Sequence, residues 1–281
     1  MSYVILGAGG MLGTDLVAAL AGRSVRAFTR ADLDITDAAA VGTAIEGAEV
    51  IINAAAYTRV DDAESHEDEA LAINGTAAGN AAAAAAALGA KFVQISTDYV
   101  FDGTATEPYA EDAPINPASA YGRTKAAGEQ LVRAAHPGPY IVRTAWLYGQ
   151  HGPNFARTML SLATQRDTVS VVTDQVGQPT WTRDLADQIV TLLDSEAPAG
   201  TYHGTNSGRA SWFEFAQAVF REAGLDPERV LPTDSSTFVR PAPRPAFSVL
   251  GHSSWAQAAI PEMRPWQDAL AAANRKGALA L

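Results

Sequence analysis

The chain has 281 residues, of which 47% are hydrophobic and 18% are charged, and it contains no cysteine. Disulfides, thiolate metal sites and a cysteine nucleophile are therefore excluded, and the length suits about two domains. The net charge of −11 repels nucleic acid and anionic membranes, so we expect neither as a partner.

The N-terminal residues and the overall hydropathy bear on location. Met1 to Gly7 lack a basic segment followed by a long apolar stretch, so we expect no signal peptide. No window offers the roughly 18 uninterrupted apolar residues that a membrane span needs. We therefore expect a cytoplasmic protein, and the lack of cysteine fits a reducing compartment.

Short apolar runs alternate with helix-like stretches in the first half of the chain. The expected buried strands are Tyr3–Leu6, Val25–Phe28, Val50–Asn53, Phe92–Ile95 and Tyr140–Val142. The helix-like stretches are Met11–Leu20, Ala38–Ile45, Asp61–Leu88 and Ala120–Ala134. Such alternation predicts an α/β fold with a doubly wound parallel sheet of Rossmann type, in which ligands bind at the carboxyl ends of the strands.

Glycine and proline interrupt the chain more often after about Gly149. We expect a strand at Val169–Val172, helices at Leu185–Leu193 and Trp212–Ala223, and an extended connector at Arg240–Pro245, where prolines block a helix. The pattern predicts a dinucleotide-binding domain over residues 1–150, with some later chain returning to its sheet. Residues 151–281 would form a smaller, irregular α/β lobe that mainly binds substrate.

A glycine-rich loop follows the first strand and opens the first helix. Its glycines are spaced three apart, whereas the pattern Gly-x-Gly-x-x-Gly would need a glycine at position 12. Glycines let the backbone turn tightly and approach a pyrophosphate, and the helix N-terminus supplies N–H donors. An ordinary strand–helix turn has similar residues, but the place at the first strand favours a dinucleotide held by Gly7, Gly10, Met11, Leu12 and Gly13.

The end of the second strand indicates which nicotinamide cofactor is bound. An NAD site usually has an acid about here for the ribose 2′-hydroxyl. This chain has Arg30, a cation suited to a 2′-phosphate, so we predict NADPH as the preferred cofactor, with NADH tolerated. The other cofactor contacts that we predict lie at strand ends: Asp34, Ile35, Asn53, Ala54 and Ala55.

A catalytic set for carbonyl reduction is indicated by three residues. Tyr121 and Lys125 are four residues apart and therefore share one face of a helix. A nearby ammonium favours the phenolate, which lowers the pKa of the phenol and makes it a better acid. Lys125 can also reach the cofactor ribose. Thr97 directly follows the fourth strand, so its hydroxyl can bind the substrate carbonyl at the same sheet edge.

Together these motifs resemble the dTDP-4-dehydrorhamnose reductases and related deoxysugar 4-ketoreductases, within the extended short-chain dehydrogenases. The resemblance covers nearly the whole chain and is carried by residues 7–13, 32–36, 53–61, 96–101, 121–125, 143–149, 174–180, 240–250 and 264–266. It implies hydride transfer from NADPH to C4 of a dTDP-4-keto-6-deoxysugar, as from dTDP-4-dehydrorhamnose to dTDP-L-rhamnose. It also implies Thr97, Tyr121 and Lys125 as the catalytic set, with Val60, Tyr99 and Trp146 facing the sugar.

A metal is the one point where the chain departs from some members of this family. Those members bind Mg²⁺ between subunits through glutamates, one of them just after the glycine loop. This chain has Asp15 there, a shorter carboxylate, so we expect no required Mg²⁺ and no metal site. The histidines show no metal-ligand spacing. Either a monomer or a homodimer fits the sequence.

Two other functions stay open at this point. A nucleotide-sugar epimerase or dehydratase shares the fold and the tyrosine–lysine pair, but an epimerase would consume no net NADPH. A non-catalytic regulatory subunit of the same fold, such as those that accompany methionine adenosyltransferase, would use the nucleotide site only structurally. The sequence does not reveal which 4-keto sugar is used or the configuration of the product.

Overall fold

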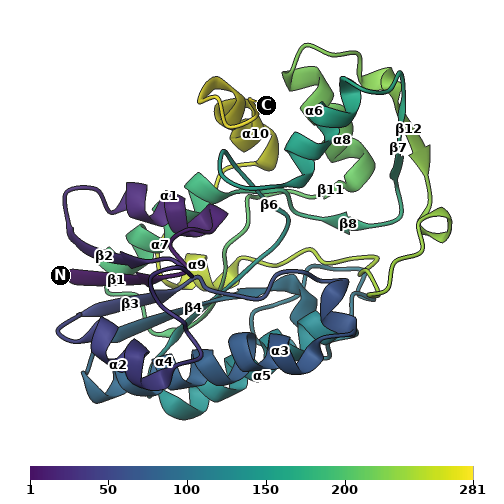
Figure 1. The fold of residues 1–281 in the computed structure, drawn as a ribbon. Coiled ribbons are helices and arrows are strands. Elements are labelled where there is room, and N and C mark those ends of the chain that lie inside the picture. The colour runs from purple at the N-terminus through teal and green to yellow at the C-terminus, as the bar shows by residue number, and fades with distance from the viewer. Residues whose placement is uncertain (281) are drawn as a thin grey trace.

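A six-stranded parallel sheet is the central layer of the protein in the computed structural model, which describes residues 1–280 (Figure 1). The strand order is β10-β5-β4-β3-β1-β2, and every neighbouring pair is parallel. The strands are β1 (Ser2–Leu6), β2 (Ser24–Phe28), β3 (Val50–Asn53), β4 (Lys91–Thr97), β5 (Tyr140–Thr144) and β10 (Gly200–His203). The predicted doubly wound Rossmann-type sheet is thus confirmed.

Helices cover both faces of this sheet. The helices α1 (Met11–Ala19) and α7 (Thr182–Asp194) pack together on one face. The other face carries α2 (Ala38–Ile45), α4 (Ala78–Ala87) and α5 (Ala120–Ala135) (Figure 1). Leu, Ile, Val and Ala side chains fill the space on each side. No helix within residues 1–280 is long and apolar enough to cross a membrane.

The expectation of a buried second strand is wrong. β2 is the edge strand and pairs only with β1, and none of its five residues is buried. An edge strand is covered on fewer sides than a central one, so its side chains stay in contact with water. The opposite edge is β10, which comes from the second half of the chain and pairs with β5.

The helical stretch after β3 is divided into several pieces. It contains the 3₁₀ turn Asp62–Glu64, α3 (Glu67–Leu71), a π-helical segment Ala72–Ala77 and then α4. Asn74, in the π segment, binds both backbone groups of Tyr57 at 2.9 and 3.1 Å and the Thr124 hydroxyl at 3.1 Å. Gly128 of α5 lies against the Asn74 carbonyl, where a Cβ would be only 2.1 Å away. The segment therefore ties the loop after β3 to α5.

A second, smaller lobe packs around its own apolar core above the sheet. Its helices are α6 (Phe155–Ala163), α8 (Trp212–Glu222) and α10 (Trp266–Arg275), and its main strands β7 (Val169–Val172) and β12 (Val230–Thr233) are parallel. Short strands β6 (Leu147–Tyr148), β8 (Val176–Gly177), β9 (Thr180–Trp181) and β11 (Ala210–Ser211) connect it to the sheet layer. A capping box of Ser211 and Glu214 begins α8.

One extended segment, which we call the crossing segment (residues 247–250), touches both lobes. Phe247 N–H donates to the Gly103 carbonyl at 3.1 Å, and Ser248 N–H donates to the Val176 carbonyl at 2.8 Å. It follows the expected proline-rich connector, which forms neither helix nor strand. The segment continues into α9 (Ser253–Gln257), whose Trp255 is part of the core beside the sheet.

Candidate active site

A cavity of about 1180 Å³ opens at the carboxyl edge of the sheet, between the two lobes. Small-molecule sites commonly enclose about 300–1,000 Å³, so the cavity has room for a dinucleotide and part of a second ligand. Its lining includes every predicted site residue except Asn53: Gly7, Gly10, Met11, Leu12, Gly13, Arg30, Asp34, Ile35, Ala54, Ala55, Val60, Thr97, Tyr99, Tyr121, Lys125 and Trp146.

The glycine loop is packed so closely that side chains are excluded at two positions. Gly7 has a φ of +81°, and a Cβ there would lie 2.5 Å from the Ala55 nitrogen. At Gly13 a Cβ would lie 2.2 Å from the Gly7 carbonyl oxygen. Gly10 is the N-cap of α1 and offers no side-chain acceptor. The first N–H groups of α1 therefore face the cavity without a capping side chain, an arrangement suited to a pyrophosphate.

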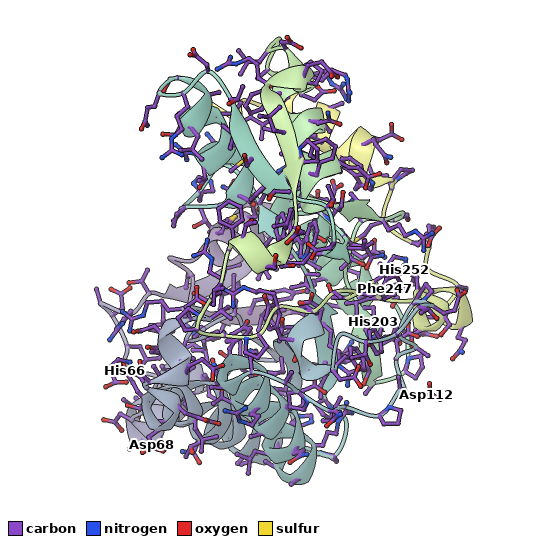
Figure 2. All side chains as sticks on the ribbon, turned by 90° about the vertical axis from the view of Figure 1, so that its right-hand side faces the viewer. His66, Asp68, Asp112, His203, Phe247 and His252 are labelled. Carbon is purple, nitrogen blue, oxygen red and sulfur yellow. The ribbon has the colours of Figure 1, made fainter. Side chains whose placement is uncertain are left out.

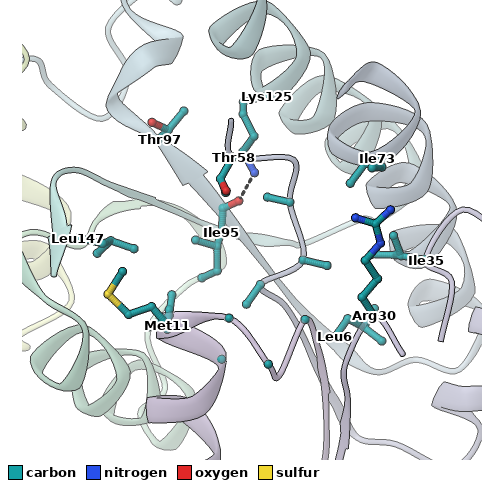
Figure 3. A pocket seen from close by; sticks show the side chains of 18 of the residues that line it. Leu6, Met11, Arg30, Ile35, Thr58, Ile73, Ile95, Thr97, Lys125 and Leu147 are labelled. Atoms are coloured by element: carbon teal, nitrogen blue, oxygen red, sulfur yellow. Dashed lines mark hydrogen bonds between the residues drawn. The ribbon is translucent and has the colours of Figure 1, made fainter. Parts of the chain in front are cut away.

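Arg30 contributes a cation to the cavity lining, on a different side from Thr97. In Figure 3 its side chain and that of Thr97 enter the cavity from different sides. The two nearby acids bind their own neighbours. The Asp32 carboxylate accepts from the Thr29 backbone and hydroxyl at 2.9 and 2.6 Å, and the Asp34 carboxylate accepts from Thr36 in the same way at 2.9 and 2.7 Å.

The beginning of α5 places Tyr121 beside the end of β4. Ser119 is the N-cap, and its hydroxyl accepts from the Gly122 N–H at 3.1 Å. A Cβ on Gly122 would lie 2.2 Å from the Tyr99 carbonyl oxygen, so only glycine permits this approach. As a result the rings of Tyr121 and Tyr99 meet edge to face with their centroids 5.5 Å apart.

Burial, more than proximity, sets the protonation of the tyrosine–lysine pair. Burial raises the pKa of Tyr121 to about 12, and a hydrogen bond with Thr97 offsets only part of this. Burial also lowers the pKa of Lys125 to about 8, although Glu129 raises it. The expected lowering of the phenol pKa by Lys125 is therefore wrong for this structure. The phenol stays protonated at neutral pH and can serve as an acid.

Within residues 1–280, Lys125 makes one hydrogen bond, to the backbone of β4. Its Nζ donates to the Ile95 carbonyl at 2.7 Å (Figure 3). An ammonium has three donors, so two stay available for a ligand on the cavity side. The spacing of Tyr121 and Lys125 thus brings both groups to the same cavity, as the helical periodicity predicts.

A stacked pair of tryptophans forms part of the cavity wall. Trp146 has a left-handed backbone with φ +47°. Its ring stacks on Trp212, with centroids 3.5 Å apart and planes 5° apart, and both residues line the cavity. Gly177 leaves the space for this ring, because a Cβ there would lie 2.5 Å from it. The stacking on Trp212 and the space left by Gly177 therefore hold the Trp146 ring at the cavity.

Asn53 differs from its predicted position. Its side chain is fully buried below the cavity floor, where its amide donates to Gln94 at 2.8 Å and its carbonyl accepts from Ala55 N–H at 3.2 Å. Successive side chains of a strand point in opposite directions, and at Asn53 this alternation directs the side chain into the protein interior rather than into the cavity. Sequence reasoning also missed Asp98, Ile73 and Trp212 as cavity residues. The last of these comes from the distant α8.

Residue types that can bind a metal are dispersed over the described part of the chain. Within residues 1–280 no group of three or more His, Cys, Asp or Glu side chains is placed to hold a metal ion. Figure 2 shows His66 and Asp68 far from His203 and His252. Asp15 is buried against α7, where its carboxylate accepts from the Thr182 hydroxyl at 2.5 Å.

The fold and the site together define the class of protein. A Rossmann-type sheet, a glycine turn at an uncapped helix N-terminus, and a threonine, a tyrosine and a lysine around one cavity are the features of an NAD(P)-dependent oxidoreductase of the short-chain dehydrogenase type.

Comparisons with known proteins identify the family. The model of the RmlD substrate binding domain matches residues 1–278. A dTDP-4-keto-6-deoxy-D-glucose reductase of Streptomyces niveus is 49% identical over 95% of this chain and 94% of its own. A dTDP-4-dehydrorhamnose reductase of Streptomyces griseus is 48% identical over 95% of this chain and 91% of its own. The chain belongs to the dTDP-4-dehydrorhamnose reductase family.

A solved structure agrees with this assignment. The dTDP-4-dehydrorhamnose reductase of Bacillus anthracis, determined in complex with NADP, is 39% identical and has a TM-score of 0.95. The match covers 98% of this chain and all of the other. A nicotinamide dinucleotide is thus bound by a relative with nearly the same backbone.

Proposed function

We propose that this protein uses NADPH to reduce the C4 keto group of a dTDP-linked 4-keto-6-deoxysugar, as in the conversion of dTDP-4-dehydrorhamnose to dTDP-L-rhamnose. The observation that carries the proposal is the meeting of Thr97, Tyr121 and Lys125 in the cavity that begins at the glycine loop. The cofactor, when bound, supplies the hydride. The residues of this chain supply orientation and the proton.

Each of the three side chains has a distinct part in this proposal. Tyr121 is protonated at neutral pH and donates its proton to the oxygen that forms at C4. Lys125, held by the Ile95 carbonyl, stabilises the phenolate that remains and orients the cofactor ribose. Thr97 holds the keto oxygen in place. We assign Val60, Tyr99 and Trp146 to the sugar, and we assign the glycine loop to the pyrophosphate.

The test of the function is an assay of purified protein with dTDP-4-dehydrorhamnose and its C3 and C5 isomers, following NADPH oxidation and product configuration. We expect one NADPH consumed for each sugar reduced. An epimerase would interconvert sugars without net consumption. A regulatory subunit would bind the nucleotide without turnover and would co-purify with a larger partner. Relatives named as reductases favour the first outcome.

The cofactor preference gives a first prediction. Arg30 lines the cavity, where we assign it to the ribose 2′-phosphate, and both nearby acids are engaged by threonines. Removing a charge-assisted contact costs about 1.5–3 kcal/mol, which is roughly ten- to a hundredfold. We therefore expect Arg30→Ala to lower the ratio of kcat/KM for NADPH over NADH by that factor.

The control for this measurement is Arg26→Ala. Arg26 lies on β2, the strand that leads to Arg30, but its guanidinium donates to the Glu46 carbonyl at 2.5 Å, away from the cavity lining. The cofactor ratio should stay unchanged in that variant. A wild-type ratio below one would contradict the proposed NADPH preference.

The second prediction concerns metal. We propose that Mg²⁺ is not required, because the Asp15 carboxylate is turned inward to Thr182. Excess EDTA should leave kcat and the elution volume in gel filtration unchanged. A Mg²⁺-dependent shift in elution that Asp15→Ala abolishes would contradict this. The cytoplasmic location and the choice between monomer and homodimer stay predictions from the sequence.

A further inference from the structure

An acid that has no part in the proposed reaction lies in the wall of the cofactor cavity. Glu69 belongs to α3, and together with Ala72 and Ile73 it lines the cavity. The three residues follow the spacing i, i+3 and i+4, which places side chains on one face of a helix. Glu69 is also exposed to solvent, so it lies at the open rim of this wall.

Arg30 extends toward the same wall from the end of β2. In Figure 3 its guanidinium points toward the side chains of Ile35 and Ile73, and all of these residues line the cavity. Ile73 comes one helical turn after Glu69. The positive charge of Arg30 and the negative charge of Glu69 therefore lie at the same end of the cavity, where we assign the adenosine part of the cofactor.

The Glu69 carboxylate has no protein partner of its own. Glu67, on the same helix, is bound by Arg123 at 2.7 and 2.8 Å, whereas within residues 1–280 neither Glu69 nor Arg30 takes part in a salt bridge or a side-chain hydrogen bond. Both charges are therefore available to a ligand that enters this end of the cavity.

The other charged groups near Glu69 and Arg30 are engaged by neighbouring side chains. Arg59 lies close enough for the charge of Glu69 to act on it, but its guanidinium is held by Asp62 at 3.1 Å and by the Tyr57 hydroxyl at 3.1 Å. The two acids that follow Arg30 accept hydrogen bonds from threonines. Glu69 thus differs from its charged neighbours in being free.

We propose that Glu69 is a specificity-determining residue that limits the preference of this protein for NADPH over NADH. The inference rests on the proposed function, which assigns Arg30 to the ribose 2′-phosphate. This phosphate is the group by which the two cofactors differ, and a phosphate monoester carries about 1.5 to 2 negative charges at neutral pH. The Glu69 carboxylate repels it and competes with it for Arg30. NADH meets no such repulsion.

The test is the binding of the two reduced cofactors, measured by their fluorescence, and it needs no turnover. The selectivity ratio is the Kd of NADH divided by the Kd of NADPH. Glu69→Gln keeps the size of the side chain and removes its charge, so we expect the ratio to rise about three- to tenfold at low ionic strength. Glu69→Lys adds a cation at the same place and should raise the ratio further.

Salt separates an effect of charge from an effect of shape. At 1 M salt the Debye length is only about 3 Å, so the ratios of Glu69→Gln and wild type should converge. A difference that persists undiminished at this salt concentration would overturn the proposal, because it would show that Glu69 acts by packing rather than by its charge.

The matched control is Asp68→Asn. Asp68 precedes Glu69 on α3 and is likewise exposed, but it does not belong to the cavity lining. The substitution changes the net charge of the protein by the same amount as Glu69→Gln and should leave the selectivity ratio unchanged. Equal changes in the two variants would indicate a general effect of net charge and would overturn the role of Glu69.

Two further outcomes complete the test. An unchanged ratio in both Glu69→Gln and Glu69→Lys would overturn the proposal. Equal weakening of NADH and NADPH binding would overturn it too, because it would show that Glu69 contacts a part that both cofactors share. If the wild-type protein bound neither cofactor, the proposed reductase function itself would be refuted.

Discussion

Tyr121→Phe lowers kcat by about 10²- to 10⁴-fold, the range of general-acid catalysis, while the protein stays folded. The phenol is the only acid in the proposed set that is fully protonated at neutral pH, because burial raises its pKa to about 12. The ring remains and keeps its edge-to-face contact with Tyr99. Steady-state reduction of the keto sugar, together with a circular dichroism melting curve, measures both parts of this expectation.

The matched control is Tyr148→Phe. Tyr148 is fully buried in the second lobe, and its hydroxyl has no hydrogen-bond partner among residues 1–280. Removing that hydroxyl should change neither kcat nor stability by a measurable amount. Near-normal turnover in Tyr121→Phe would remove Tyr121 from the mechanism, and equal losses in both variants would point to packing rather than acid catalysis.

Arg143→Met lowers the free energy of unfolding by about 3–5 kcal/mol, the cost of leaving one charge of a buried pair without its partner. Arg143 on β5 and Glu129 on α5 are 3% and 2% exposed. The guanidinium binds both carboxylate oxygens at 2.8 Å. Glu129 also accepts the Ser96 hydroxyl at 2.6 Å, so the pair supports the strand end beside Thr97. Urea unfolding followed by fluorescence gives the difference.

Arg133→Met is the control, because Arg133 meets the same carboxylate from the surface. It lies 3.5 Å from Glu129 and is 43% exposed, so its loss should cost about 1 kcal/mol or less. Equal effects of the two variants would contradict the role of the buried pair.

The effect of Arg143→Met also depends on pH, and its sign follows from the pKa of Glu129. Burial raises the pKa of Glu129, but the combined effect of Arg143 and Ser96 in the opposite direction is larger. The net shift is therefore downward from the ordinary value of 4.5. A carboxylate whose pKa is lower in the folded than in the unfolded protein stabilises the fold at pH values above the unfolded-state pKa. This stabilisation is lost as the pH falls through the folded-state pKa. The difference between wild type and Arg143→Met should therefore narrow below about pH 4.5.

Local sequence patterns predicted the sheet, and all but one of the predicted site residues line the cavity. Apolar runs of strand length and a glycine turn depend on neighbouring residues, so β1 and α1 could be placed directly. The helical spacing of Tyr121 and Lys125 likewise places them on one face. Because ligands bind at the carboxyl ends of parallel strands, the sequence alone assigns Thr97 and Ala54 to the same cavity.

The features that sequence reasoning missed depend on contacts between distant segments. The exposure of β2 follows from the strand order, which local patterns do not encode. Trp212 begins α8 in the second lobe, and it reaches the cavity because its ring stacks on that of Trp146. The pKa values of Tyr121 and Lys125 follow from burial by the whole fold rather than from their spacing. Asn53 shows the same limit, since its direction depends on Gln94 of the neighbouring strand.

The late return of the chain to the sheet has a consequence for protein engineering. The sheet layer includes α7 and β10, which lie beyond residue 180, and Trp255 of α9. A chimera joined at one point near residue 150 would combine a sheet from one parent with its last strand from another. To exchange sugar specificity between relatives, the segments that form the second lobe should therefore be transplanted one by one. All strands of the sheet and the helices that cover it then come from the same parent protein.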